Sequence, residues 1–245
     1  MPQNIYDNPT FFKGYKALRQ RDTGLNGAVE MPALQSLLPV LVGLQVLDLG
    51  CGFGDFARFA RLHGAASVVG VDISANMLEE ARHLTADRAI TYQHSSIERF
   101  QPAPGVTFDL VVSSLALHYV EDYAAAVRAV WQVLKPGGLF VFSVEHPLCT
   151  ANPVGWIKDE TDNKVHWPLD HYQSEGQRDT RWFVDGVIKY HRTTQTWINT
   201  LLDNGFVLER MSEPGPIAEA VQARPALADE NRRPPFLLLR ARRQA

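Results

Sequence analysis

The chain has 245 residues, of which 45% are hydrophobic, and a formal net charge of −3 at pH 7. A chain of this length can bury a single core, and its slightly acidic balance gives no basic surface of the kind that binds nucleic acid. It shows no signal-peptide pattern, no run of about 18 apolar residues and only two cysteines, so we expect a cytoplasmic protein without a membrane span, a disulfide framework or a cysteine-metal site.

The first 45 residues form an N-terminal segment of mixed character. Apolar residues recur at near-helical spacing over 28–42, and Pro39 should break or end that helix. Tyr15 and Arg19 are four residues apart, so they could share one helical face. We therefore expect a helical flap ahead of the regular part of the chain.

From residue 46 the sequence alternates short apolar runs with amphipathic stretches. The apolar runs are nearly unbroken, which is typical of strands buried on both faces of a parallel sheet. Repeated strand–helix alternation predicts a doubly wound α/β sheet. The predicted strands span residues 46–49, 67–71, 90–92, 108–113 and 138–144, and the predicted helices span 55–63, 76–85 and 122–134.

The alternation stops after the fifth predicted strand. Residues 146–192 are rich in Pro, Asp, His, Trp and Tyr without a clear period, which indicates a functional lid or insertion. A helix over 193–204 and strands over 206–211 and 236–240 are predicted to follow. We expect one domain, 1–245, with these four parts: a flap (1–45), a ligand-binding core (46–147), a lid (148–192) and a C-terminal helix with a strand pair (193–245).

The stretch from Val46 to Gly54 reads as a strand that runs into a glycine loop and then into a helix. Glycines let a ligand approach the backbone, and a helix N-terminus offers free N–H groups. The alternative is a tight turn without a ligand. Asp72 lies eighteen residues after Gly54 at the end of the next strand, where an acid can bind ribose hydroxyls or simply favour the N-terminus of the following helix.

The glycine spacing distinguishes between ligands. A dinucleotide loop needs glycine at its first, third and sixth positions, but the sixth position from Gly50 is Asp55. Asp48 and Asp55 would also bring negative charge close to a diphosphate. A ligand with an amino group and a sulfonium tolerates these acids better, so we do not expect a nicotinamide oxidoreductase.

In these motifs the chain resembles the class I S-adenosylmethionine-dependent methyltransferases, specifically the small-molecule, ubiquinone-biosynthesis-like group. Residues 46–54, 70–74, 108–122 and 134–147 are similar to four of its motifs in order. The resemblance implies a Rossmann-like, doubly wound, seven-stranded sheet, mostly parallel with a C-terminal antiparallel strand. It also implies methyl transfer from S-adenosyl-L-methionine to O, N or C of a small-molecule substrate.

The resemblance assigns cofactor contacts by position. Asp72 would bind the ribose, and Arg19 of the flap could bind the methionine carboxylate unless it is only a solvated helix charge. Ser96 stands where the family often has an acid that contacts adenine, although it could be an ordinary loop hydroxyl. The expected cofactor-binding residues are Asp48, Gly50, Cys51, Gly52, Gly54, Asp72, Ile73, Met77, Ser96, Ile97, Ser113, Tyr15 and Arg19.

Methyl transfer needs a general base only when the acceptor starts protonated. His118 and His146 follow the fourth and fifth predicted strands, at the edge where open α/β sheets bind ligands, so they are candidate catalytic bases, with a packing role as the alternative. No metal is expected. The candidate substrate-binding residues of the lid, which could instead pack among themselves, are Tyr172, Trp182, His191 and Arg192.

Two other functions remain open at this point. One is a non-catalytic S-adenosylmethionine-binding or regulatory protein that kept the site and lost turnover. The other is an RNA methyltransferase, which the acidic balance disfavours. We expect a small-molecule partner, no nucleic acid or membrane, and a monomer or homodimer.

Overall fold

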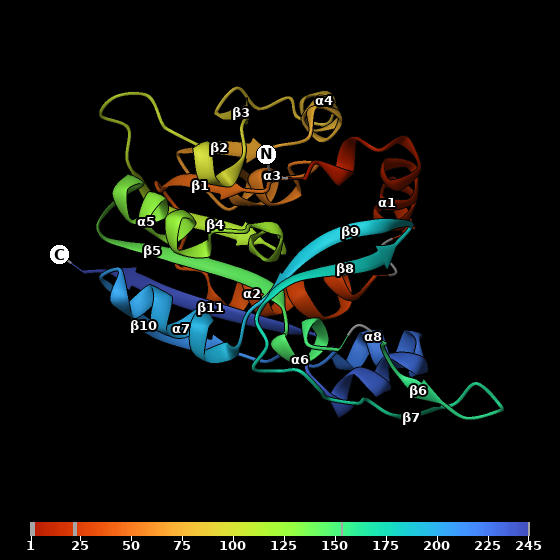
Figure 1. Cartoon of the computed structure of the whole chain (residues 1–245). Helices are drawn as coiled ribbons and strands as arrows, with labels where there is room; N and C mark the ends of the chain where they lie inside the picture. Colours follow the sequence, from red (N-terminus) through yellow and green to blue (C-terminus); the bar gives the residue numbers. More distant parts are fainter. Residues whose placement is uncertain (1–2, 22–23, 153, 245) are drawn as a thin grey trace.

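A seven-stranded sheet with the order β10-β11-β5-β4-β1-β2-β3 forms the centre of the computed structural model, which describes residues 3–21, 24–152 and 154–244 (Figure 1). The strands from β5 to β3 are parallel, and β11 pairs antiparallel with both β5 and β10. The predicted mostly parallel sheet with a C-terminal antiparallel strand is therefore confirmed. Its strands are β1 (Gln45–Leu49), β2 (Ser67–Asp72), β3 (Ile90–His94), β4 (Phe108–Ser114), β5 (Leu134–Glu145), β10 (Phe206–Ser212) and β11 (Phe236–Arg243).

Helices cover both faces of this sheet, because successive residues of a strand point to opposite sides. Leu47 and Val111 pack in one buried cluster with α5 and α7, whereas Val46, Leu110 and Val112 pack in a second cluster with α2 and α3. The unbroken apolar runs of the sequence thus reflect burial on both faces. The helices of the sheet layers are α2 (Met31–Leu37), α3 (Asp55–Leu62), α4 (Ala75–His83), α5 (Tyr123–Val133) and α7 (Thr194–Asp203).

The N-terminal segment is helical, as predicted, but its helices are divided differently. A 3-10 turn, η1 (Ile5–Asp7), leads into α1 (Pro9–Arg21), and a π-helical turn, η2 (Asn26–Glu30), continues directly into α2. Helix α2 ends at Leu37, and Leu38 is extended because proline disfavours a helical conformation in the residue before it. We call residues 3–21 the flap.

The lid contains regular structure that the sequence did not predict. After the short helix α6 (Pro147–Thr150), two hairpins follow: β6 (Ile157–Lys158) with β7 (Lys164–His166), and β8 (Gly176–Trp182) with β9 (Val184–His191). Strand β8 alternates between partly buried and exposed residues, but few of its side chains are apolar, so it carries no hydrophobic alternation. The chain closes with α8 (Ala218–Ala223) and η5 (Pro225–Arg232) before β11.

The hairpin β8–β9 lies against the flap, although more than 150 residues separate them in sequence (Figure 1). The Phe11 ring packs edge-on to Trp182 and Phe183, with centroid distances of 5.2 and 5.5 Å. The Gln3 side chain donates to the Gly186 carbonyl at 2.7 Å and accepts from the Ile188 N–H at 2.9 Å. The flap and the hairpin therefore form one cover over the carboxyl ends of the central strands.

In the part of the chain that the structure describes, no helix is long and apolar enough to cross a membrane.

Candidate active site

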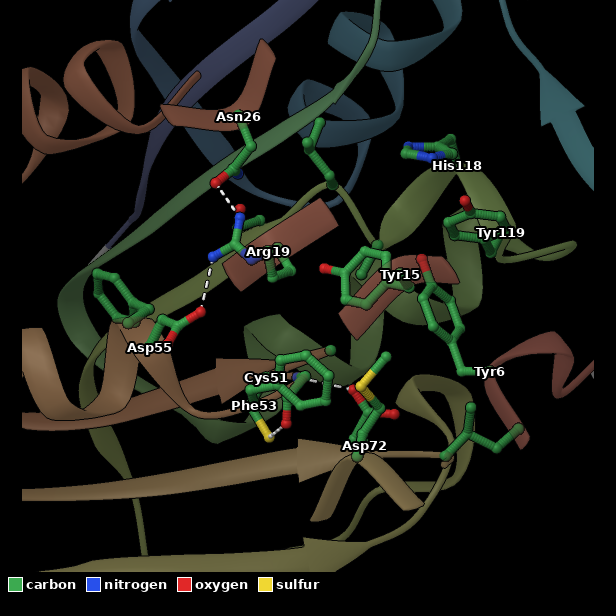
Figure 2. A pocket seen from close by; sticks show the side chains of 18 of the residues that line it. Tyr6, Tyr15, Arg19, Asn26, Cys51, Phe53, Asp55, Asp72, His118 and Tyr119 are labelled. Atoms are coloured by element: carbon green, nitrogen blue, oxygen red, sulfur yellow. Dashed lines mark hydrogen bonds and ion pairs between the residues drawn. The ribbon is translucent and has the colours of Figure 1, made fainter. Parts of the chain in front are cut away.

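A cavity of about 480 Å³ lies at the carboxyl ends of β1, β2, β4 and β5, beneath the flap and the hairpin β8–β9. Figure 2 shows Arg19, Cys51 and Phe53 towards one end, and Tyr119 and His118 towards the other. We call these the loop end and the Glu145 end, the latter after the last residue of β5. Of the residues expected from the sequence, those that line the cavity are Tyr15, Arg19, Asp48, Gly50, Cys51, Gly52, Asp72, Ile73, Met77, Ser96, Ile97, His118 and Trp182.

A row of aromatic rings runs between the two ends. Phe53 and Tyr15 have ring centroids 5.7 Å apart, Tyr15 and Tyr6 5.3 Å, Tyr6 and Tyr119 6.0 Å, and Tyr119 and His118 4.4 Å. The flap therefore supplies the middle of this row, between residues that follow β1 and β4. Burial raises the pKa of Tyr15 to about 12 and that of Tyr6 well above its usual value, so both hydroxyls stay protonated at neutral pH.

The glycines of the loop after β1 adopt positive φ angles of 77°, 51° and 75° at Gly50, Gly52 and Gly54. A Cβ atom at Gly50 would lie 2.3 Å from the Ala116 Cβ, and one at Gly54 would lie 2.0 Å from the Tyr92 hydroxyl. At Gly52 it would meet no atom within 4 Å. Gly54 thus leaves room for Tyr92 and does not line the cavity, whereas Gly52 leaves room for a ligand.

Asp72 joins the end of β2 to the glycine loop. Its Oδ2 accepts a hydrogen bond from the Gly52 N–H, and its Oδ1 accepts one from the Ser74 N–H, each at 2.9 Å. Each carboxylate oxygen keeps a further acceptor site for a ligand. Burial raises the pKa of Asp72, so bound hydroxyl donors would favour its charged form.

Two buried polar atoms of the cavity lack a partner among the described residues. They are Oδ2 of Asp48, whose residue is 1% exposed, and the Ser96 hydroxyl. Buried polar atoms are almost always hydrogen-bonded, so a ligand with donors at these two points would complete the site. Burial, followed by the charge of Asp72, raises the pKa of Asp48 well above its usual value, and a cation beside it would counter both effects.

At the loop end, each terminal nitrogen of the Arg19 guanidinium has its own partner. Nη2 forms an ion pair with Asp55 at 2.6 Å, and Nη1 donates to the side-chain oxygen of Asn26 (Figure 2). Asn26 in turn donates to Glu30 at 2.7 Å. This placement follows from the π-helical turn η2, which the sequence pattern did not indicate; such turns often occur at functional sites.

Glu30 is fully buried and connects η2 to the sheet. Its Oε1 accepts hydrogen bonds from the hydroxyls of Ser114 on β4 at 2.8 Å and Ser143 on β5 at 2.6 Å. Burial raises the pKa of Glu30, and the two hydroxyls partly offset this effect. Glu30 thus fixes the ends of two strands relative to the residue that holds Arg19.

Asp7 fastens the flap to α4. Its Oδ1 accepts from the Ser74 hydroxyl at 2.5 Å and from the Asn76 N–H at 3.2 Å, at the helix N-terminus. Partial burial raises the pKa of Asp7, but the hydrogen bonds from Ser74 and the backbone lower it on balance. The sequence analysis missed Asp7, because nothing local connects it with a helix 68 residues further along.

His118 lines the Glu145 end but is poorly suited to be a base. Its Nδ1 accepts a hydrogen bond from the Glu145 N–H at 3.3 Å, and its residue is 2% exposed. Burial lowers the pKa of His118 to about 4, so the ring is neutral at pH 7. With Nδ1 acting as acceptor, the proton lies on Nε2, and His118 can donate a hydrogen bond to a ligand.

Glu145 also lines this end and pairs with a buried lysine of the hairpin. Its Oε1 lies 2.5 Å from Nζ of Lys189, which is 7% exposed. Burial raises the pKa of Glu145, but the charge and hydrogen bond of Lys189, together with other nearby positive charges, lower it on balance, so the carboxylate stays ionised. Lys189 Nζ also lies 5.9 Å from the Tyr119 ring and 5.6 Å from the Trp182 ring.

His146, the other candidate base, lies outside the cavity lining. Its Nδ1 accepts from the Leu148 N–H at 3.1 Å and caps α6, and its Nε2 lies 2.7 Å from Glu213. Both ring nitrogens are therefore engaged away from the cavity. The geometry gives His146 a role in fixing the turn after β5 rather than in proton transfer.

Three candidate residues of the lid also make structural contacts outside the cavity lining. Nδ1 of His191 bonds to the Thr150 hydroxyl at 2.7 Å, and its Nε2 bonds to the Tyr172 carbonyl at 2.8 Å. Arg192 donates to the carbonyls of Val120 and Glu121 at 2.6 Å each. These contacts anchor the base of the hairpin to the sheet.

Ser113, expected at the cofactor, is fully buried outside the cavity lining. Its hydroxyl donates to the Leu49 carbonyl at 2.8 Å and so links β4 to the start of the glycine loop. Its neighbour Ser114 lines the cavity instead. Adjacent strand residues point in opposite directions, and the sequence alone did not show which of the two faces the site.

Comparisons with known proteins agree with this geometry. A family described as a methyltransferase domain matches residues 47–142. The crystal structure of an S-adenosylmethionine dependent methyltransferase from Mesorhizobium loti is 48% identical, covers 90% of this chain and 100% of that chain, and superposes with a TM-score of 0.82.

Two relatives whose names state an activity are similar over a shorter region. The malonyl-[acyl-carrier protein] O-methyltransferase of Enterobacter lignolyticus is 39% identical over 45% of this chain and 43% of its own. The ubiquinone biosynthesis O-methyltransferase of Neisseria meningitidis is 38% identical over 42% of this chain and 44% of its own. The chain thus matches less than half the length of each of these two relatives, and the match gives no information about the substrate-binding part.

Proposed function

Because this chain belongs to the S-adenosylmethionine-dependent methyltransferases, we propose that it methylates a small molecule that binds at the Glu145 end of the cavity. One observation supports this best: the cavity is about 480 Å³ in size and lies beneath the flap and the hairpin. This volume is typical of a site for small ligands, whereas a polymer needs an open groove. The name of the Neisseria meningitidis relative, a ubiquinone biosynthesis O-methyltransferase, supports a small acceptor, whereas the substrate in the name of the Enterobacter lignolyticus relative is carried on a protein.

The loop end fits S-adenosylmethionine in the chemistry of its donors and acceptors. The unpartnered Asp48 carboxylate suits an amino group, and Arg19 suits the carboxylate of the methionine portion. Asp72 has free acceptor sites for ribose hydroxyls, and the Ser96 hydroxyl lacks a partner near the position proposed for adenine. Gly52 leaves the open space in which a ligand can approach the backbone.

S-Adenosylmethionine supplies a methyl group on a positively charged sulfur, which makes that methyl group electrophilic. The task of the protein is then to align the acceptor and to exclude water, and alignment of reactants can contribute roughly 7–11 kcal/mol to lowering a barrier. The flap and the hairpin exclude water by covering the cavity, and the rings of Tyr6 and Tyr15 line its wall. The Nε2–H of His118 can orient an acceptor through a hydrogen bond.

Transfer of a labelled methyl group into a fractionated cell extract tests this function. The protein is incubated with methyl-labelled S-adenosylmethionine and with separate small-molecule, protein and RNA fractions. Label should enter the small-molecule fraction, together with an equal amount of S-adenosylhomocysteine, and Asp72→Ala should reduce both. Label that enters only the RNA or the protein fraction would contradict the proposal.

A further inference from the structure

The charged residues that line the cavity are mostly acidic. Among the described residues, five carboxylates line it and only one permanently charged base, Arg19, which is already paired with Asp55. His118 adds no charge at neutral pH, since burial lowers its pKa to about 4. The lining acids are Asp48, Asp55, Asp72, Glu98 and Glu145. This excess favours cationic ligands.

Four of these acids divide between the two ends of the cavity. Asp48, Asp55 and Asp72 belong to β1, to the start of α3 and to the end of β2, beside the glycine loop, so they lie at the loop end. Glu145 lies at the other end, where its backbone N–H bonds to His118 and its side chain pairs with Lys189. The contacts of Glu145 thus involve none of the residues proposed to hold the cofactor.

Aromatic rings line the cavity from its middle to the same end. Tyr6 and Tyr119 meet nearly at right angles, as do Tyr15 and Trp182, with interplanar angles of 81° and 89°. All four residues line the cavity. Within each pair the edge of one ring packs on the face of the other, and the ring faces that remain open attract cations, organic ammonium groups among them.

Lys189 shows that these rings accept an ammonium group. Its Nζ lies within 6 Å of the Tyr119 and Trp182 ring centroids and pairs with Oε1 of Glu145. Lys189 does not itself line the cavity. Oε2 of Glu145 accepts no hydrogen bond from any described residue, so it is available to a second cation.

Building on the function proposed above, we propose that the methyl acceptor is an organic amine, which binds as an ammonium ion to Oε2 of Glu145 beside the rings of Tyr119 and Trp182. An anionic acceptor would meet the Glu145 carboxylate with no unpaired cation beside it. A neutral alcohol or phenol would form no ion pair with Glu145, and His118 offers it an Nε2–H but no free lone pair.

The bound ammonium must lose a proton before its nitrogen can react. The bound ammonium loses one N–H proton through the Glu145 carboxylate to water, which frees the nitrogen lone pair. That pair forms the new N–C bond while the C–S bond breaks and its electrons remain on sulfur. The product is again a cation, a methylated ammonium, and the acidic end stabilises it as it stabilised the substrate.

Calorimetric titration of the full chain saturated with S-adenosylhomocysteine tests the inference by binding alone. The probes are benzylamine, benzyl alcohol and benzoate, which have similar size but carry a positive, zero and negative charge. We expect benzylamine to bind at least about tenfold more tightly than either of the others. Tighter binding of benzyl alcohol or benzoate, or no binding of benzylamine at about 10 mM, overturns the inference.

Glu145→Gln should reduce the preference for benzylamine to about threefold or less, whereas Glu160→Gln, on an exposed turn, should leave it unchanged. Glu145→Gln leaves the buried Lys189 unpaired, so the double variant Glu145→Gln with Lys189→Met serves as the control for folding. In the double variant the preference should also be lost. A tenfold preference that survives in either variant contradicts the role of Glu145.

Lys189→Met alone separates a site for cations from a site for anions. Without the competing ammonium, Glu145 should bind benzylamine at least as tightly as in the unchanged protein. A loss of benzylamine binding, or benzoate binding that depends on Lys189, overturns the inference. The affinity for S-adenosylhomocysteine is measured in each variant. If this affinity is normal, a failed amine test overturns the inference but leaves the proposed function standing. If the unchanged chain does not bind S-adenosylhomocysteine, the proposed function itself fails.

Discussion

The Gly52 N–H donates a hydrogen bond to Oδ2 of Asp72 at 2.9 Å, so the glycine loop after β1 and the acid at the end of β2 act as one unit. Asp72→Ala removes both this support and the acceptor proposed for the ribose hydroxyls. Loss of charged hydrogen bonds costs about 1–3 kcal/mol, so the dissociation constant of S-adenosylhomocysteine should rise roughly 5- to 150-fold. Calorimetry on a variant with a cooperative thermal transition measures this, and an unchanged affinity would refute the role of Asp72.

Gly52→Ala tests whether open space at this position is needed by a ligand. Gly43→Ala is its matched control, because both glycines have positive φ, 51° and 78°, and both have no atom within 4 Å of a new Cβ. Each change should cost about 1 kcal/mol of stability through left-handed strain. Only Gly52→Ala should weaken S-adenosylhomocysteine binding, by about tenfold or more. Equal affinity in the two variants would mean that nothing approaches Gly52.

Arg19→Met tests the contact proposed for the methionine carboxylate. Asp55 keeps its ion pair with Arg58 at 2.5 Å, so the substitution leaves no acid unpaired. The variant should bind S-adenosylhomocysteine about 10- to 100-fold more weakly and 5′-methylthioadenosine, which lacks the carboxylate, less than about threefold more weakly. An equal loss for both ligands would indicate a general disturbance of the flap.

His118 makes the stability of the fold depend on pH. Its pKa is about 4 in the folded chain and about 6.5 when unfolded, so only the unfolded state binds this proton near pH 5. The contribution of His118 to stability is therefore complete above pH 6.5 and declines as the pH falls through the range from 6.5 to 4.

Comparison with His118→Asn isolates that contribution from those of other groups. Between pH 7 and pH 5 the unchanged protein should lose about 2 kcal/mol more unfolding free energy than the variant. Urea unfolding at both pH values measures the difference. Parallel losses in the two proteins would show that His118 titrates normally in the folded state.

His146→Ala distinguishes a structural histidine from a catalytic one. Loss of the cap on α6 should lower the unfolding free energy by about 1 kcal/mol. The rate of methyl transfer should change by less than about threefold, because removal of a true general base costs roughly 10²- to 10⁴-fold. A loss in that higher range, in a variant that unfolds cooperatively, would restore His146 as a base.

The sheet could be predicted because its strands are buried on both faces. Val46 and Leu47 pack on opposite sides, and the apolar run that contains them is visible without any structure. The glycine loop and Asp72 could be predicted for a similar reason, since backbone space and an acid at a strand end are properties of single positions.

The rest of the site depends on contacts between distant segments. Glu145 faces the cavity and His146 does not, because adjacent residues at the end of β5 point in different directions. The sequence does not show which of the two directions leads into the cavity. Asn26 and Glu30 are placed by a π-helical turn, and Lys189 by a hairpin whose first strand, β8, carries mainly polar residues. The aromatic content of the lid predicted a substrate wall, but of the candidates named there only Trp182 lines the cavity.

The most direct test of the central claim is calorimetric titration of the unmodified protein with S-adenosylhomocysteine and, separately, with NADH. Asp55 stands where a dinucleotide site needs its third glycine. Asp48, just before the glycine loop, has a carboxylate oxygen without a partner. We predict saturable binding of one S-adenosylhomocysteine per chain and no binding of NADH. Binding of NADH without binding of S-adenosylhomocysteine would contradict the assignment of this cavity.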